Sequence, residues 1–349
     1  MNDRDKLVLL QYAAAHGLVD LSCAAALFSL WYVWSPGMGT ITLAILVYGV
    51  LAFGTQPLFG WLSDRLALPR LMAVAGCTLT ALGVLVLPVS FWLVVILLGV
   101  GNALFHVGGG SISLNLTPYR ATAPGLFVAP GAIGLALGTL IGKSDFAYGW
   151  IFAVALMVMA VILYRLKPSL PPTRTTAPAR SMQWVGAFVL IFLVIAGRSL
   201  LGFSWVMPWK SDVLLLLVMT IAVVLGKGLG GILADRYGFI AVALGGVVVS
   251  APLLIIFPAV PALAIIGVFL FQFTMPVTLA AMYRLFPKRP GLAFGLPCLA
   301  LIIGALPVLL QQQRYFSGTD FLAISFALVA VAVFLGLRSV VNRAKTVCP

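Results

Sequence analysis

The sequence predicts an all-α membrane protein with twelve transmembrane helices in two six-helix pseudo-repeats. Three observations predict it: an apolar composition, twelve long apolar runs, and short motifs that recur in both halves. Of the 349 residues, 62% are hydrophobic and 8% charged, and the mean hydropathy is +1.16. A soluble domain carries about 25% charged residues. This composition excludes a soluble globule, a disordered chain and a secreted disulfide scaffold.

Each apolar run is close to the roughly 20 residues that a helix needs to cross a bilayer. The connections between most runs are very short. The runs cover approximately residues 7–32, 41–62, 69–88, 90–115, 124–143, 149–166, 184–206, 213–234, 238–257, 260–283, 291–312 and 321–341.

One connection is long and rich in Pro, Thr and Arg, and it follows the sixth run. Such a composition is typical of a linker. We therefore expect an N-terminal six-helix bundle at 1–166, a cytoplasmic linker at 167–183 and a C-terminal six-helix bundle at 184–349.

The distribution of positive charge predicts the orientation in the membrane. Sixteen of the 21 Lys and Arg residues lie before the first run, in or at the edges of the even-numbered connections, or at and beyond the end of the last run. The odd-numbered connections and their edges hold three, and Arg198 and Lys227 lie well inside runs. Because cytoplasmic loops collect Lys and Arg, both termini are predicted to be cytoplasmic. The net charge of +13 is therefore a topology signal, and no nucleic-acid partner is expected.

Short motifs recur in the two halves in the same order and at equivalent places. One pair is offset by 171 residues and two pairs by 166. Three matches in register indicate a duplication of a six-helix unit. The pairs are 60–65 (GWLSDR) with 231–236 (GILADR), 104–106 (LFH) with 270–272 (LFQ), and 124–126 (PGL) with 290–292 (PGL).

The loop at 60–70, GWLSDRLALPR, resembles the signature of the major facilitator superfamily, with Ala67 or Leu68 in place of its second glycine. Segments 15–20 (AHGLVD) and 101–106 (GNALFH) are similar to the fosmidomycin-resistance branch of bacterial drug efflux proteins. Val107 stands where that branch often has proline. The resemblance implies the major facilitator fold, a bacterial inner-membrane location and a substrate site between the two halves near the bilayer midplane.

The resemblance also assigns a gating role to the two repeated loops. An Asp at the cytoplasmic end of a helix can accept N–H groups at the next helix start and pair with Arg, and such contacts can form in one conformation and break in the other. Ordinary snorkelling of loop charges is the alternative. The gating residues are Gly60, Asp64, Arg65, Arg70, Asp235 and Arg236.

His16 and Asp20 are four residues apart in the first run, so they share one face of that helix. At about 1.5 Å per residue, His106 in the fourth run lies at a depth similar to that of His16. Arg198 in the seventh run lies at a depth similar to that of Asp20. Ionisable groups inside a span are costly and usually face a cavity or a partner. We therefore expect an Asp20–Arg198 pair or a shared substrate-facing site.

Burial favours the neutral form of a carboxylate and a nearby cation favours its charged form. A change in that balance would couple transport to protons, and Asp20 is the leading candidate because the chain has no Glu. A static salt bridge is the alternative for Asp20. For His16 and His106, the choice is between proton relay or substrate contact and an interhelical packing bond. A metal held by these three residues is conceivable, but their spacing is not diagnostic and no metal is expected.

Two further residues are candidates for substrate contact. Gln272 occupies the repeat position of His106 and offers both donor and acceptor groups. Lys227 lies among glycines that do not have the spacing of a phosphate-binding loop. It could attract an anionic substrate or extend to the cytoplasmic face, while the glycines permit tight helix contact.

The resemblance and these residues imply a secondary transporter that works by alternating access, with proton-coupled efflux of a small organic compound or drug. Proton-coupled uptake of a small anionic metabolite is the alternative. An intramembrane metal-dependent enzyme built on His16, Asp20 and His106, or a sensor without transport, is disfavoured. No cofactor is expected, the partners are a small molecule, protons and the lipid bilayer, and the chain is predicted to be monomeric.

Overall fold

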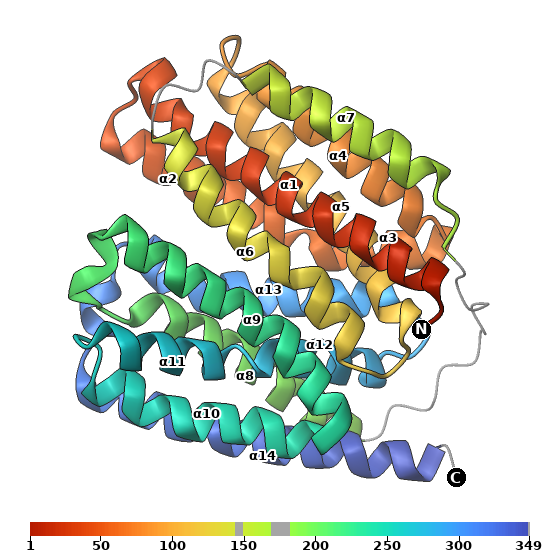
Figure 1. Ribbon diagram of the computed structural model, residues 1–349, viewed down its shortest axis with the longest axis vertical. Helices are drawn as coiled ribbons and strands as arrows, with labels where there is room; N and C mark the ends of the chain where they lie inside the picture. The colour runs from red at the N-terminus through yellow and green to blue at the C-terminus, as the bar shows by residue number, and fades with distance from the viewer. Residues whose placement is uncertain (144–148, 169–181, 348–349) are drawn as a thin grey trace. The chain divides into compact units, whose positions relative to one another are not determined.

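A computed structural model describes residues 1–143, 149–168 and 182–347, with side chains up to residue 342 (Figure 1). Within these ranges the regular structure is helical and contains no strand. Ten of the helices or helix pairs are long and apolar enough to cross a membrane, and two shorter apolar ones cover Pro69–Leu85 and Gly149–Arg165. These twelve segments match the twelve predicted runs, so the all-α fold class is confirmed.

The observed bounds agree with the apolar runs to within a few residues at most ends. The helices are α1 (Asp3–Trp34), α2 (Met38–Gly49), α3 (Gln56–Leu66), α4 (Pro69–Leu85), α5 (Phe91–Leu116), α6 (Thr122–Gly142), α7 (Gly149–Arg165), α8 (Met182–Ser204), α9 (Val213–Tyr237), α10 (Phe239–Ile256), α11 (Pro261–Phe271), α12 (Thr274–Leu285), α13 (Pro290–Leu309) and α14 (Thr319–Val347), with the π-helix η1 (Val50–Gly54) and the 3₁₀ turns η2 (Pro208–Ser211) and η3 (Gln313–Tyr315).

Two of the predicted spans are not continuous α-helices. The second consists of α2, η1 and α3, and the tenth consists of α11 and α12. In each, a proline follows the irregular turn: Pro57 follows η1, and Pro276 lies four residues after Gln272. Proline has no N–H to bond the carbonyl four residues earlier, so the helix widens or breaks there. The break in the tenth span places Gln272 at a helix end.

Most of the predicted linker, residues 169–181, lies outside the described residues, as do Asp145 and the cations Arg174 and Arg180. The boundaries of the two predicted bundles stay a prediction. The chain divides into two compact units, which are described separately. Unit 1 is Met1–Leu116, Phe127–Pro172 and Arg289–Leu299, and unit 2 is Thr117–Leu126, Thr173–Lys288 and Ala300–Pro349.

In unit 1, α4 packs against α5 and α7, and α1 packs against α5. Figure 1 shows α4 beside α7. The contact between α4 and α5 depends on Gly76, because a Cβ atom there would lie 2.6 Å from Cα of Phe105. This close approach fixes the part of α5 that carries His106, which faces α1.

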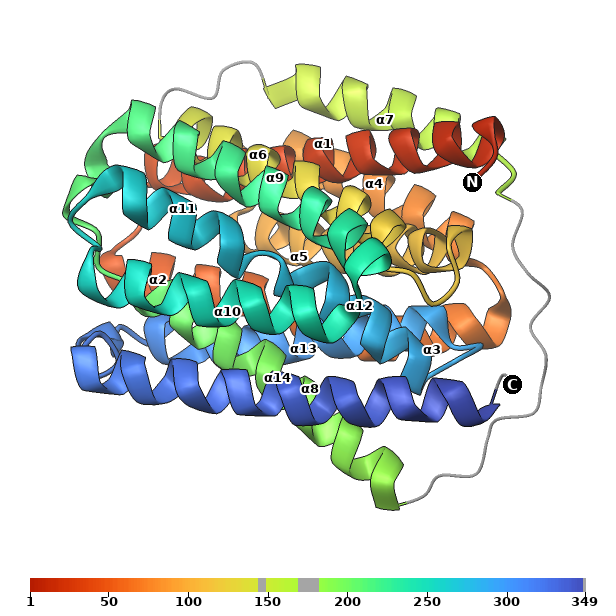
Figure 2. The same ribbon diagram turned by 60° about the horizontal axis from the view of Figure 1, so that its bottom comes forward.

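In unit 2, α14 packs against α8 and α10, and α11 packs against α9 and α10. Figure 2 shows α14 running beside α10. The glycines predicted to permit tight helix contact do so: a Cβ on Gly226 would lie 2.8 Å from Cβ of Gln272, and one on Gly230 would lie 2.6 Å from Cα of Phe273. These contacts hold α9 against the α11–α12 break.

Replacement of Gly76 by alanine should destabilise the protein, because the backbone of Phe105 cannot move away without separating α4 from α5. Gly245→Ala is the matched control: Gly245 is also helical, but nothing lies within 4 Å of its Cβ position. Alanine at that site should be neutral or should stabilise the helix by up to about 1 kcal/mol. Thermal unfolding of the purified proteins in detergent measures both, and equal shifts in Tm would contradict this packing account.

Candidate functional site

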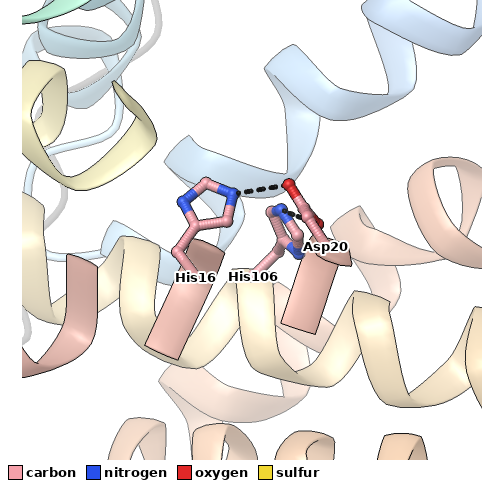
Figure 3. Close-up of side chains that lie close together, drawn as sticks. All are labelled: His16, Asp20 and His106. Atoms are coloured by element: carbon pink, nitrogen blue, oxygen red, sulfur yellow. Dashed lines mark ion pairs between the residues drawn. The ribbon is translucent and has the colours of Figure 1, made fainter. Parts of the chain in front are cut away.

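A cluster of ionisable side chains lies between α1 and α5 in unit 1 (Figure 3). Nε2 of His16 is 3.2 Å from Oδ2 of Asp20, and Nε2 of His106 is 3.6 Å from Oδ1 of the same carboxylate. The amide of Asn102 donates a hydrogen bond to Oδ1 at 3.1 Å. The structure therefore brings two of the predicted site residues, His16 and His106, to the carboxylate of a third, Asp20.

Helical spacing accounts for this arrangement. His16 and Asp20 are one turn apart on α1, and Asn102 and His106 are one turn apart on α5, so each helix presents two polar side chains on one face. Sequence reasoning missed Asn102. Its four-residue spacing from His106, inside an otherwise apolar span, is the signal that could have found it.

A third helix, α6, closes the cluster from another side. A Cβ atom on Gly131 would lie 2.5 Å from Nε2 of His16 and 2.6 Å from Oδ2 of Asp20. The backbone of Gly131 therefore packs directly against the side chains of His16 and Asp20. His16 and His106 are buried, with 4% and 6% of their surface exposed. The side chain of Asp20 is 20% exposed, so the carboxylate is the accessible member.

Main-chain carbonyls fix the protonation of both imidazole rings. Nδ1 of His16 lies 2.8 Å from the carbonyl oxygen of Phe127, and Nδ1 of His106 lies 2.9 Å from that of Asn102. A carbonyl oxygen only accepts hydrogen bonds, so each Nδ1 must carry a hydrogen. In a neutral ring Nε2 then presents a lone pair to Asp20. Lone pairs facing a carboxylate at these distances repel it unless a proton or another cation lies between them.

The cluster thus has the composition of a shared-proton site. The same ligand atoms lie within 4.8 Å of one another, a spacing that a tetrahedral metal ion could also accept. His16, Asp20 and His106 are the described residues that could hold such an ion.

A second polar contact lies in unit 2, between α8 and the α11–α12 break. Nη1 of Arg198 donates to Oε1 of Gln272 at 3.2 Å, and the guanidinium lies 5.9 Å from the centre of the Phe271 ring. Arg198 is buried, with 6% of its surface exposed. Asp20 belongs to unit 1 and Arg198 to unit 2, so their expected pairing stays a prediction. Lys227 is half-buried on α9, and its role also stays a prediction.

The two gating loops make the same kind of contact in each unit. Asp64, at the end of α3, accepts hydrogen bonds from the N–H groups of Gly291 and Leu292 at 2.8 and 2.9 Å. Asp235, near the end of α9, accepts them from Ala121 and Thr122, also at 2.8 and 2.9 Å. These N–H groups lie at the starts of α13 and α6, where they have no partner within their own helix and where the helix dipole favours negative charge.

The capped helices are far away in the chain and are not the helices that follow each Asp. The helix after Asp64 is α4, and its first residue, Pro69, has no N–H to donate. The backbones can meet because Gly60 lies against Gly291 and Gly231 lies against Ala121, at positions where a Cβ atom would overlap the facing carbonyl. Gly60 and Gly231 are equivalent in the repeat.

We expected these aspartates to pair with neighbouring arginines. Among the described residues, neither aspartate forms a salt bridge with an arginine. The guanidinium of Arg65 lies over the Trp61 ring and that of Arg236 over the Tyr237 ring, each 5.3 Å from the ring centre. Arg70 donates to the carbonyl of Tyr164 at 3.2 Å. The aspartates are already satisfied by backbone N–H groups, which leaves the arginines to stack at the surface.

Sequence reasoning also missed Arg284, at the end of α12. Its Nε and Nη2 donate to the carbonyl of Tyr119 at 3.1 and 2.8 Å, and its guanidinium lies 4.0 Å from the centre of the Phe239 ring. It therefore supports the segment that leads into α6, beside the contact made by Asp235. A charge in the last turn of α12 is the local signal, but its partner lies 165 residues away.

Removal of the Asp64 carboxylate should expose the start of α13 to exchange. In Asp64→Ala, amide hydrogen exchange in residues 291–295 should be about fivefold faster, because a helix-capping bond contributes about 1 kcal/mol. Asp235→Ala should have its largest effect at the start of α6 and a smaller effect on 291–295. Exchange that rises equally at both helix starts in both variants would contradict the separate contacts.

Histidine spectroscopy can test the two imidazole rings directly, since the chain has two His residues. In protein labelled with ¹⁵N-histidine, both rings should show a protonated Nδ1 across the pH range in which the protein stays folded. The chemical shifts of the ring nitrogens measure this by nuclear magnetic resonance. An unprotonated Nδ1 in either ring would contradict the hydrogen bonds to the main-chain carbonyls.

Comparisons with known proteins agree with this architecture. The family model of the Major Facilitator Superfamily matches residues 13–296. The uncharacterized MFS-type transporter YfnC of Bacillus subtilis strain 168 is 26% identical, over 76% of this chain and 79% of that protein.

Two solved structures share the fold at low sequence identity. The fucose:proton symporter FucP of E. coli is 14% identical and covers 95% of this chain and 98% of its own, with a TM-score of 0.69. The human organic anion transporter MFSD10 is 14% identical and covers 96% and 100%, with a TM-score of 0.71. The family match extends over most of the chain, and the chain belongs to the Major Facilitator Superfamily: it is a multi-pass membrane protein and a secondary transporter of a small molecule, not an enzyme.

Proposed function

We propose that this transporter exports a small organic compound in exchange for protons, and that the cluster around Asp20 carries the proton. The observation that carries the proposal is the set of three acceptors at this site. Two imidazole Nε2 atoms lie 3.2 and 3.6 Å from the oxygens of one carboxylate. A proton shared between an imidazole nitrogen and the carboxylate stabilises this arrangement. Without that proton, the lone pairs of the two imidazoles repel the carboxylate.

The cluster can pass that proton on because its members are held by different helices. His16 and Asp20 move with α1, and Asn102 and His106 move with α5. A shift of one helix along the other would lengthen the Nε2–carboxylate distances and change which group holds the proton. The partly exposed carboxylate is the group that exchanges protons with water.

The aspartate contacts supply a conformational step for alternating access. Asp64 links α3 to α13, and Asp235 links α9 to α6, so each joins helices from different halves of the sequence. We propose that the transporter alternates between two conformations and that both aspartate caps are formed in one of them. In the other state the helix starts separate and the N–H groups meet water instead.

The export direction rests on the resemblance to the fosmidomycin-resistance branch, which His16, Asp20 and His106 support. The excess of Lys and Arg in even-numbered connections supports an orientation with both termini in the cytoplasm. We propose that the chain works as a monomer in a bacterial inner membrane. The neighbour FucP is a fucose:proton symporter, which supports proton coupling on this fold.

Proton-coupled uptake of a small anionic metabolite is the second candidate. The buried guanidinium of Arg198 favours its anionic substrate, and an anion-binding arginine is compatible with either direction of transport. The neighbour MFSD10 is an organic anion transporter. The direction of the driving pH gradient separates export from uptake.

Proteoliposome transport tests the proposal. Substrates from a panel of antibiotics, sugars and organic anions should be transported faster when a pH gradient is imposed. If the protein is an exporter, the substrate should accumulate in inside-out vesicles whose lumen is acidic. Asp20→Asn should lower the gradient-driven transport rate at least about tenfold, because an asparagine side chain cannot bind and release a proton. Asp320→Asn is the control: it removes an exposed carboxylate at the start of α14 and should transport normally. Transport indifferent to pH, or an unaffected Asp20→Asn variant, would overturn proton coupling.

A further inference from the structure

The buried charge of Arg198 lacks a charged partner among the described residues of unit 2. Its hydrogen bond goes to the neutral amide oxygen of Gln272 at 3.2 Å, and its Nε is buried with no hydrogen-bond partner. Burial of a guanidinium is costly unless it is paired and hydrogen-bonded. The guanidinium therefore carries a charge that is not neutralised within unit 2 and at least one N–H donor without an acceptor.

The amide of Gln272 is oriented by this contact. A guanidinium has donors and no acceptor, so the amide atom that faces it must be the oxygen. The NH₂ group of Gln272 is then left as a second donor beside the guanidinium. Because Gln272 lies at the α11–α12 break, its side chain is held at a helix end.

A third donor lies just beyond the end of α8. Trp205 directly follows Ser204, the last residue of that helix. Its indole packs against Phe271 with ring centres 4.9 Å apart, and Phe271 also contacts Arg198. Nε1 of Trp205 is buried without an acceptor. Unsatisfied buried donors are rare in native proteins, and an unseen ligand is one explanation for them.

We propose that Arg198 and Gln272 bind the anionic group of the transported molecule, a carboxylate or a phosphonate on a small organic compound, with Trp205 available to an acceptor elsewhere on it. The inference rests on the proposed function, since it names the substrate class of the transporter. A bound oxyanion neutralises the guanidinium and accepts from its fork and from the Gln272 amide.

The internal repeat gives this assignment a counterpart. Gln272 stands at the repeat position of His106, and each contacts an ionisable residue on the first helix of its own half: His106 contacts Asp20, and Gln272 contacts Arg198. The first half then holds an acidic cluster that needs a cation. The second half holds one buried arginine that needs an anion.

Ligand binding to the purified protein in detergent tests the proposal, measured by calorimetry at fixed pH. Benzoate, succinate and phenylphosphonate are the anionic probes, and benzamide is the neutral counterpart of benzoate. At least one anion should bind, and benzamide should bind at least about tenfold more weakly than benzoate or not at all. Failure of all three anions to bind, or equal binding of benzamide, overturns the inference. Equally tight binding of chloride or inorganic phosphate also overturns it, because the site would then hold an inorganic anion.

The matched variants locate the site. Arg198→Gln should weaken binding of the responding anion at least about tenfold, the loss expected for a hydrogen bond to a charged group. Arg314→Gln makes the same change at an exposed arginine and should leave binding unchanged. Unchanged binding in Arg198→Gln overturns the proposal. If that variant does not fold, the comparison of benzoate with benzamide on the unaltered chain still decides.

The binding assay needs no pH gradient, so its outcome is separable from proton coupling. Anion binding to Arg198 without gradient-driven transport would contradict the proposed function alone. Gradient-driven transport of neutral compounds, without anion binding, would contradict the further inference alone.

Discussion

A charge buried in an apolar membrane protein must be neutralised by a partner, and this requirement governs the polar chemistry of the chain. With eight acids, all of them Asp, few carboxylates are available for that purpose. Asp20 meets the requirement with two imidazoles and the amide of Asn102. Within unit 2, Arg198 meets it only in part, through Gln272. The difference suggests two roles: the first cluster completes itself by holding a proton, and the second is completed by the molecule that it transports.

The duplicated architecture uses one structural device twice. In each unit a glycine permits two helix backbones to touch, and an aspartate one turn later caps the helix that is touched. Gly60 with Asp64 acts on α13, and Gly231 with Asp235 acts on α6. Each bond is modest in energy and lies at a helix start, so it can break without disturbing the core. That property suits the gating role that we propose for these two contacts.

Local patterns in the sequence were sufficient for the twelve helices and for part of the site. Apolar length predicts each span, and the four-residue spacing predicts that His16 and Asp20 share a face. Depth along the helices predicts only that His106 lies at the level of His16, and the structure brings its ring to Asp20. The partners that sequence reasoning missed are the main-chain carbonyls, the amide of Asn102 and the starts of α13 and α6. These depend on how distant segments meet, which no local pattern records.

Proton coupling as we propose it requires Asp20 to change its protonation state within the membrane. Because the chain has no Glu, infrared difference spectroscopy can resolve this, since the side-chain carboxyl bands come from Asp alone. Acidification of the protein in lipid should produce a protonated-carboxyl band that is missing in Asp20→Asn and retained in Asp320→Asn. A band that is identical in the unaltered protein and in Asp20→Asn would contradict the account.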